Sequence, residues 1–163
     1  MFAELAAYAA SRGLTVVGLL DEVYAEIGYF LEVNQSKVFE GASGAAQIAK
    51  LADSYGSNPP KEVDGSAVIN VRDFRKDEIK DEEGDIVSKE KMLFVDLADG
   101  RSFAVRPSGT EPKIKYYMFG RSIPAAGQKL SADELAAAKA KVSAGLDSMW
   151  AWLEKDIDAR LAS

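Results

Sequence analysis

Apolar positions in the first part of the chain recur at the spacing of α-helices. Residues 2–12 are rich in alanine, with apolar side chains at helical intervals, and Gly13 ends this segment. A second stripe, spaced by three or four residues, consists of Leu19, Leu20, Val23 and Ile27. A third helix is predicted over roughly 43–55, with its start at 41–43 and a Pro-Pro break shortly after it. The pattern therefore predicts three helices before residue 60.

The middle of the chain is rich in β-branched and aromatic residues and predicts a sheet. Extended segments are expected at 29–33 with a continuation through 37–39, and at 67–71, 92–97, 102–105 and 113–119. The Asp-Gly step at Asp99 joins two of these segments as an antiparallel hairpin. Residues 75–91 are mostly charged and are expected to form an exposed hairpin tip or loop. In the last segment, Lys113, Lys115 and Tyr117 alternate with apolar residues and therefore share one face.

The chain ends on a long predicted helix. Its start matches a capping box, because Ser131 is followed three residues later by Glu134. The apolar stripe of this helix comprises Leu135, Val142, Leu146, Met149, Leu153, Ile157 and Leu161. Helices, strands and a final helix follow one another without regular βαβ alternation. The sequence therefore predicts an α+β fold, in which helices cover a mainly antiparallel sheet of four to five strands and a helical segment precedes the sheet.

The composition narrows the chemistry available to this protein. Its 163 residues include no cysteine and no histidine, which excludes a disulfide scaffold, a thiolate nucleophile and a Cys/His zinc site. A formal net charge of −6 argues against binding nucleic acid but is compatible with one local cationic pocket. No apolar run is long enough to span a bilayer. We therefore expect a cytoplasmic protein with neither a nucleic-acid nor a membrane partner.

One loop has the residue types of an anion-binding site. The candidate phosphate-binding residues are Arg106, Ser108, Gly109, Thr110 and Lys115. The arginine offers a planar fork of donors, the two hydroxyl groups add donors, and the glycine lets backbone N–H groups approach a ligand. The lysine adds a positive charge from the next strand, and two prolines stiffen the loop, which lowers the cost of ordering it on binding. The alternative is a hairpin loop whose polar residues only face water. Most Pro-Ser-Gly sequences form loops of this kind.

The sequence of this loop also resembles a loop of a known protein family. The run from Phe103 to Tyr117 resembles the phosphate-binding loop of the α-D-phosphohexomutase superfamily, found in the fourth domain of phosphoglucomutases and phosphomannomutases. Residues 14–30, 58–60, 72–73 and 92–100 also resemble this family. The resemblance implies a C-terminal phosphate-binding domain over 34–163. Residues 1–33 would then be a helical remnant of the third domain and a linker.

The resemblance also implies a function. Members of this family move a phosphoryl group between the 1- and 6-positions of a hexose phosphate, such as a glucose or mannose phosphate. Their loop binds the phosphate of the substrate, which by resemblance assigns this role to Arg106, Ser108, Gly109, Thr110 and Lys115. Lysine stands at 115 where some members carry arginine, a change that loses bidentate geometry but keeps the charge.

The sequence lacks other parts that the resemblance implies for a complete enzyme. Absent are the loop with the phosphoserine, the Asp-rich Mg²⁺ loop and a sugar-binding loop that contains histidine. The acidic segment 81–85 does not have the residue alternation of a metal loop and is expected to be a solvated turn. We therefore expect no catalytic residue and no cofactor in this chain, with Mg²⁺ and the remaining mutase domains required for activity.

Two other functions stay open from the sequence. A stand-alone phosphate-binding or protein-interaction module, without mutase activity, would use the same loop. A nucleic-acid binder could also have an antiparallel sheet with a covering helix, but fold does not give function and the acidic charge opposes this alternative.

Overall fold

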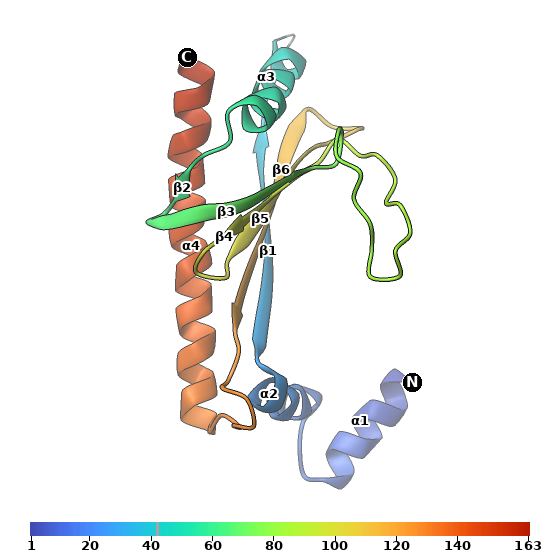
Figure 1. The fold of residues 1–163 in the computed structure, drawn as a ribbon. Helices are drawn as coiled ribbons and strands as arrows, with labels where there is room; N and C mark the ends of the chain where they lie inside the picture. Colours follow the sequence, from blue (N-terminus) through green and yellow to red (C-terminus); the bar gives the residue numbers. More distant parts are fainter. Residues whose placement is uncertain (42) are drawn as a thin grey trace. The chain divides into compact units, whose positions relative to one another are not determined.

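The computed structural model describes residues 1–41 and 43–163, and these contain four helices and six strands (Figure 1). The helices are α1 (Phe2–Ser11), α2 (Val16–Ile27), α3 (Gly44–Ser57) and α4 (Ala132–Ala162). The strands are β1 (Tyr29–Val38), β2 (Glu62–Val63), β3 (Ser66–Asp73), β4 (Leu93–Leu97), β5 (Ser102–Pro107) and β6 (Lys113–Ser122). Among the helices within the described ranges, none is both long and apolar enough to cross a membrane.

The strands form one sheet in the order β1-β6-β5-β4-β3-β2. The four consecutive pairs from β2 to β6 are antiparallel, which confirms the predicted α+β class. The sheet has six strands rather than the predicted four to five. The additional strand is β2, whose two residues are too few to show any alternation of apolar and polar positions.

Local signals in the sequence place most helix ends correctly. The capping box before α4 is confirmed, because the Ser131 N–H donates to Glu134 Oε2 (2.8 Å) and the Glu134 N–H donates to Ser131 Oγ (3.2 Å). These hydrogen bonds lower the pKa of the Glu134 carboxyl. Thr15 caps α2 by accepting a hydrogen bond from the Gly18 N–H (3.0 Å). Of the start predicted for α3 at 41–43, Ala42 lies outside the described residues.

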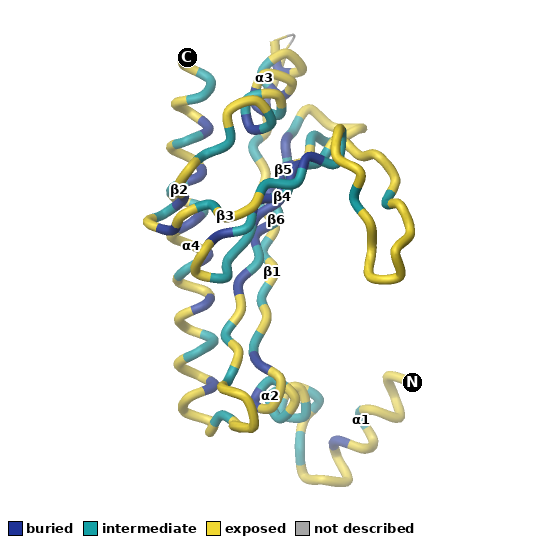
Figure 2. The backbone as a smooth tube through the Cα atoms, in the orientation of Figure 1, coloured by how far each residue is buried: buried dark blue, intermediate teal, exposed yellow. Residues whose placement is uncertain are grey.

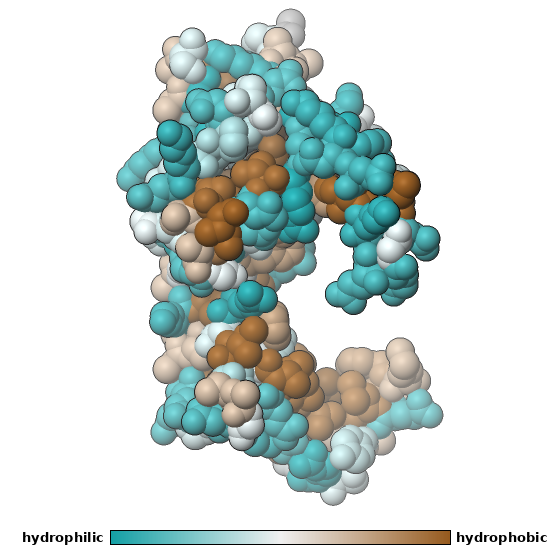
Figure 3. Space-filling view, viewed as in Figure 1, coloured by the Kyte–Doolittle hydropathy of each residue, from teal (hydrophilic) through white to brown (hydrophobic). Residues whose placement is uncertain are grey.

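The chain divides into two compact units. The first contains residues 1–31 and 121–144, and the second contains residues 32–120 and 145–163. Within the first unit the Leu130 N–H donates to the Ala25 carbonyl (2.9 Å), and Lys129 pairs with Glu26 (2.8 Å). Apolar residues gather on the surface over α1 and α2 (Figure 3). The exposed members of this surface are Phe2, Leu5, Tyr8, Val17, Leu20, Val23 and Ile27.

The core of the second unit lies between one face of the sheet and the helices α3 and α4 (Figure 2). Its sheet residues are Leu93, Val95, Leu97, Phe103, Val105, Ile114, Tyr116 and Met118, and its helix residues are Ile48, Leu51, Tyr55, Leu146, Met149, Leu153 and Ile157. Tyr116 connects the three layers, with its ring edge-on to Tyr55 of α3 (6.1 Å between centroids) and to Trp150 of α4 (5.6 Å). The opposite face of the sheet carries a stacked pair, Phe94 and Phe119 (5.5 Å), and no helix of this unit contributes to that pair.

We predict that Tyr116→Phe leaves the stability unchanged or raises it. The Tyr116 hydroxyl is buried, and within the described residues neither it nor the Tyr55 hydroxyl has a hydrogen-bond partner. Burial also raises the pKa of both phenols, so both stay neutral. Removing an unsatisfied buried hydroxyl is expected to change the free energy of unfolding by about 0 to +1 kcal/mol. Urea unfolding of wild type and variant checks this, and a loss of more than about 1 kcal/mol would reveal a partner for the hydroxyl.

Candidate functional site

The loop of residues 108–112 joins β5 to β6 and is held by the backbone at one end. The Ser108 N–H donates to the Lys113 carbonyl (2.9 Å), and the Lys113 N–H donates to the Glu111 carbonyl (2.7 Å). The Phe39 N–H, just after β1, donates to the Pro112 carbonyl (2.8 Å). The N–H groups of Gly109 and Thr110 donate to no backbone carbonyl in the described part of the chain. The loop is thus anchored at its base, and its exposed tip has N–H groups available to a ligand.

Gly109 is exposed, and its backbone does not adopt the left-handed conformation. A Cβ added there would meet no atom within 4 Å. The turn itself therefore does not require glycine at this position. What glycine still provides is an unobstructed approach of the backbone to a ligand, which is the role that the sequence predicted for it.

Arg106 and Lys115 lie directly opposite each other in the β5–β6 pair. Arg106 lies between Val105 and Pro107 in β5, and the Val105 side chain is buried in the core. Because side chains alternate along a strand, the Arg106 side chain points to the face of the sheet opposite the core. Lys115 alternates in the same way with the buried residues Ile114 and Tyr116. The two cations therefore share the face of the sheet that points away from α3 and α4, as the alternation in the sequence predicts for Lys115.

The charges around this pair are only partly balanced. Glu90 Oε2 lies 3.5 Å from Arg106 Nη2, and Glu111 Oε2 lies 2.8 Å from Lys113 Nζ. The hydrogen bond and the positive charge of Lys113 lower the pKa of the Glu111 carboxyl. Across the described residues, Lys115 forms no ion pair. Like charges directly opposite on neighbouring strands destabilise a sheet, so an anion between Arg106 and Lys115 would relieve a local repulsion.

The remaining candidates occupy the loop between these two positions. Ser108 is half-buried at the start of the loop, while Gly109 and Thr110 are exposed at its tip. The sequence did not identify Glu90 as a neighbour of Arg106, whereas Glu111 belongs to the predicted loop itself. The Leu93–Val105 register, which only the folded sheet defines, brings the residues just before β4 next to Arg106.

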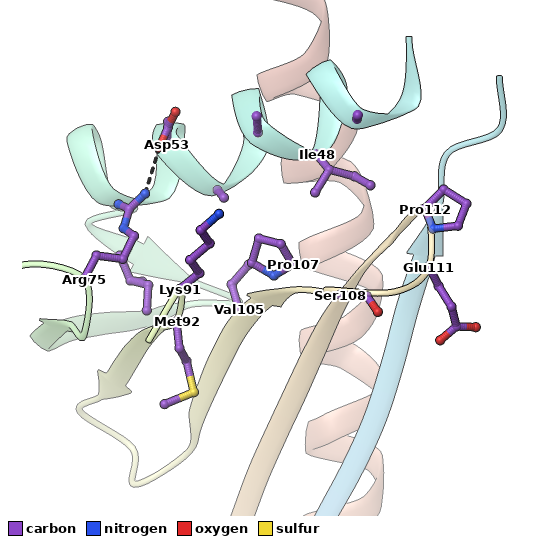
Figure 4. Close-up of a pocket in the computed structure, with 14 residues that line it drawn as sticks. Ile48, Asp53, Arg75, Lys91, Met92, Val105, Pro107, Ser108, Glu111 and Pro112 are labelled. Carbon is purple, nitrogen blue, oxygen red and sulfur yellow. Dashed lines mark hydrogen bonds and ion pairs between the residues drawn. The ribbon is translucent and has the colours of Figure 1, made fainter. Parts of the chain in front are cut away.

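A cavity of about 480 Å³ lies on the other side of β5, between α3 and the ends of the strands (Figure 4). Its lining is mostly apolar, from residues such as Ile48 and Val105, and Ser108 is the only one of the five candidate residues that borders it. The cavity also meets Arg75, but this guanidinium is already paired with Asp53 and Asp73, both at 2.8 Å. Among the described residues that line the cavity, Lys91 is then the one cation left without an ion pair, whereas Arg106 and Lys115 lie together on the face of the sheet that points away from α3 and α4.

No group of three or more potential metal ligands occurs among residues 1–41 and 43–163.

Comparison with known protein families assigns this chain to one of them. Residues 37–137 match the family described as phosphoglucomutase/phosphomannomutase, C-terminal domain, and this match covers more than half of the chain. The chain belongs to this family. The matched region contains the whole β5–β6 loop but not α1 and α2, whose resemblance to a preceding domain stays a prediction.

Relatives of this phosphoglucomutase/phosphomannomutase C-terminal domain are much longer proteins. The phosphoglucomutase of Staphylococcus haemolyticus is 34% identical over 112 residues, which cover 66% of this chain and 20% of that protein. A Staphylococcus aureus phosphoglucomutase is 34% identical over 110 residues, 65% of this chain and 20% of the relative. The chain thus spans about a fifth of the length of these relatives. A solved Staphylococcus aureus protein of unknown function has a similar fold, with a TM-score of 0.50 at 9% identity, over 83% of this chain and 95% of that one.

Proposed function

We propose that this domain binds the phosphate group of a sugar phosphate for a phosphoglucomutase or phosphomannomutase. The observation that carries the proposal is the pair of Arg106 and Lys115, placed opposite each other on the open face of the sheet beside the loop of residues 108–112. The substrate class, a glucose or mannose phosphate, comes from the relatives and not from the site.

Each proposed residue would make a different contact with the phosphate. The Arg106 guanidinium would donate two N–H groups to phosphate oxygens, and the Lys115 ammonium would supply a point charge from the neighbouring strand. The Ser108 and Thr110 hydroxyls and the N–H of Gly109 would donate from the loop. These groups bind and orient a phosphate, and none of them is a nucleophile with a base beside it. The phosphoserine and the Mg²⁺ of the reaction would come from other domains, so that residues 1–163 alone would be inactive.

The N-terminal helices fit the same proposal. We assign residues 1–33 to the end of a third domain and a linker, and residues 34–163 to the phosphate-binding domain. The apolar residues exposed on α1 and α2 would then be covered by the remaining domains of the mutase.

We predict that Arg106→Ala weakens phosphate binding at least tenfold, because a charge-assisted hydrogen bond to an ionised group contributes roughly 1.5–3 kcal/mol. The measurement is a two-dimensional NMR titration with glucose 1-phosphate and with inorganic phosphate at low salt, where we expect millimolar dissociation constants and shifts in residues 106–115. Arg121→Ala is the matched control, since it removes an exposed arginine outside the loop. If neither ligand shifts these signals in the wild type, or if Arg106→Ala binds as tightly as the control variant, the loop does not bind phosphate.

A further inference from the structure

The nearest anion to Arg106 is a carboxylate of the protein itself. Glu90 Oε2 lies 3.5 Å from Arg106 Nη2, and both side chains are about half exposed, at 47% and 49%. At this distance the contact is an ion pair rather than a strong hydrogen bond, so that it depends mainly on charge. The guanidinium proposed to bind phosphate therefore already has a negative partner when no ligand is present.

The backbone holds Glu90 at this place. Its N–H donates to the Phe74 carbonyl (3.2 Å), and its own carbonyl accepts from the Met92 N–H (2.8 Å). Both bonds lie at the base of the hairpin that joins β3 to β4. The Leu93–Val105 register, continued by one residue, places Met92 opposite Arg106. Glu90 is thus directed to the arginine by the sheet and not by the exposed tip of the hairpin.

Neighbouring lysines do not neutralise this carboxylate. Lys89 points its ammonium to the base of the hairpin, where it donates to the Lys76 and Asp77 carbonyls (both 2.6 Å). Lys91 faces the apolar cavity on the other side of the sheet. Among the described residues, Arg106 is therefore the one cation paired with Glu90.

We propose that Glu90 is an internal competitor for Arg106, so that phosphate binding is an exchange in which phosphate replaces the Glu90 carboxylate. This inference rests on the proposed function and adds a residue that sets the affinity of the site. No bond is made or broken; the guanidinium leaves one anion for another. When phosphate departs, Glu90 returns to Arg106, which weakens binding and favours release. A domain that must bind and release a phosphate in each catalytic cycle needs this balance.

The proposal predicts that Glu90→Gln binds inorganic phosphate about threefold more tightly than wild type. Exposed ion pairs contribute little, and their coupling energies correspond to factors of about 1.5 to 5 in an equilibrium constant. Glutamine keeps the size of the side chain and removes the charge. The experiment is the NMR titration of the 163-residue chain with inorganic phosphate, in wild type, Glu90→Gln and Arg106→Ala.

Glu83→Gln is the matched control, because it removes the same charge from the exposed tip of the same hairpin. The Arg106 side-chain N–H signals give a second readout. They should differ between wild type and Glu90→Gln without ligand and become alike at saturating phosphate. A Glu90→Gln affinity that is unchanged, lower, or matched by Glu83→Gln overturns the exchange. If Arg106→Ala loses phosphate binding in that case, the result supports the proposed function and contradicts only the role of Glu90. A wild-type chain that binds no phosphate overturns both.

Discussion

Replacing Arg101 with alanine is expected to lower the free energy of unfolding by about 2 kcal/mol, because it removes a largely buried guanidinium whose hydrogen bonds to charged partners contribute about 1.5–3 kcal/mol. Arg101 is only 15% exposed and pairs with Asp64 (2.6 Å) and Asp99 (2.8 Å). It also donates to the Gly145 carbonyl of α4 (2.7 Å). Ser148, one turn further along α4, donates to Asp64 (2.8 Å). One side chain thus joins the β2–β3 turn, the β4–β5 turn and the helix.

Urea unfolding at neutral pH measures this loss, with Arg121→Ala as the control for removing an exposed arginine. The acid dependence gives an independent check. Burial works to raise the pKa of Asp64 and of Asp99, but the hydrogen bonds from Arg101 outweigh it and lower both. The stability from these carboxylates is therefore present above the unfolded pKa of about 3.8 and is lost as the pH falls below it. Arg101→Ala should flatten this dependence. A variant as stable as the control would show that Arg101 does not join these elements in solution.

Leu153→Ala is expected to cost about 3 kcal/mol, because it opens a cavity between α4 and the sheet. Leu153 is fully buried, at 0% exposed, in the stripe that continues through Met149 and Ile157. Trp150, which follows Met149 in α4, packs edge-on against Tyr116 (5.6 Å between centroids), so α4 lies over the face of β6 that carries Ile114 and Tyr116. Truncation of this fully buried leucine leaves a space that its closely packed neighbours have few ways to fill.

Leu5→Ala is the matched control for this substitution. Leu5 of α1 is 44% exposed, so its truncation should cost less than about 1 kcal/mol. Chemical denaturation of the two variants compares them directly. Equal losses would mean that α4 does not pack on the sheet through Leu153, or that the apolar surface of α1 is covered in solution.

These two stability predictions bear on the candidate site through β6. Ile114 and Tyr116 are buried on the face of β6 that meets the helices, so alternation along the strand places Lys115 on the opposite, open face. The Arg101 network at the β4–β5 turn fixes the hairpin whose other end carries Arg106. The geometry of the proposed phosphate site thus depends on the core beneath it, while Arg106 and Lys115 themselves contribute little to that core.

Patterns in the amino-acid sequence are sufficient to predict the local features of this protein. Apolar spacing identified the helices, the Ser131–Glu134 pair identified the start of α4, and the Asp-Gly step identified the β4–β5 hairpin. The alternation in residues 113–119 placed Lys115 on the polar face of its strand. Each of these depends on interactions between residues that are close in the chain, which is why a linear pattern is sufficient to predict them.

Contacts between residues that are far apart in the chain follow from the three-dimensional fold. Strand β2, the Arg101 network, the apolar cavity beside α3 and the neighbours of Arg106 all depend on register and packing across the sheet. Glu90 is the clearest case, since the charged run 75–91 has no period that distinguishes it from the acids at the hairpin tip. Its place beside Arg106 follows from hydrogen bonds at the base of the hairpin. Such contacts are set by the balance of the whole fold, and no short stretch of sequence contains them.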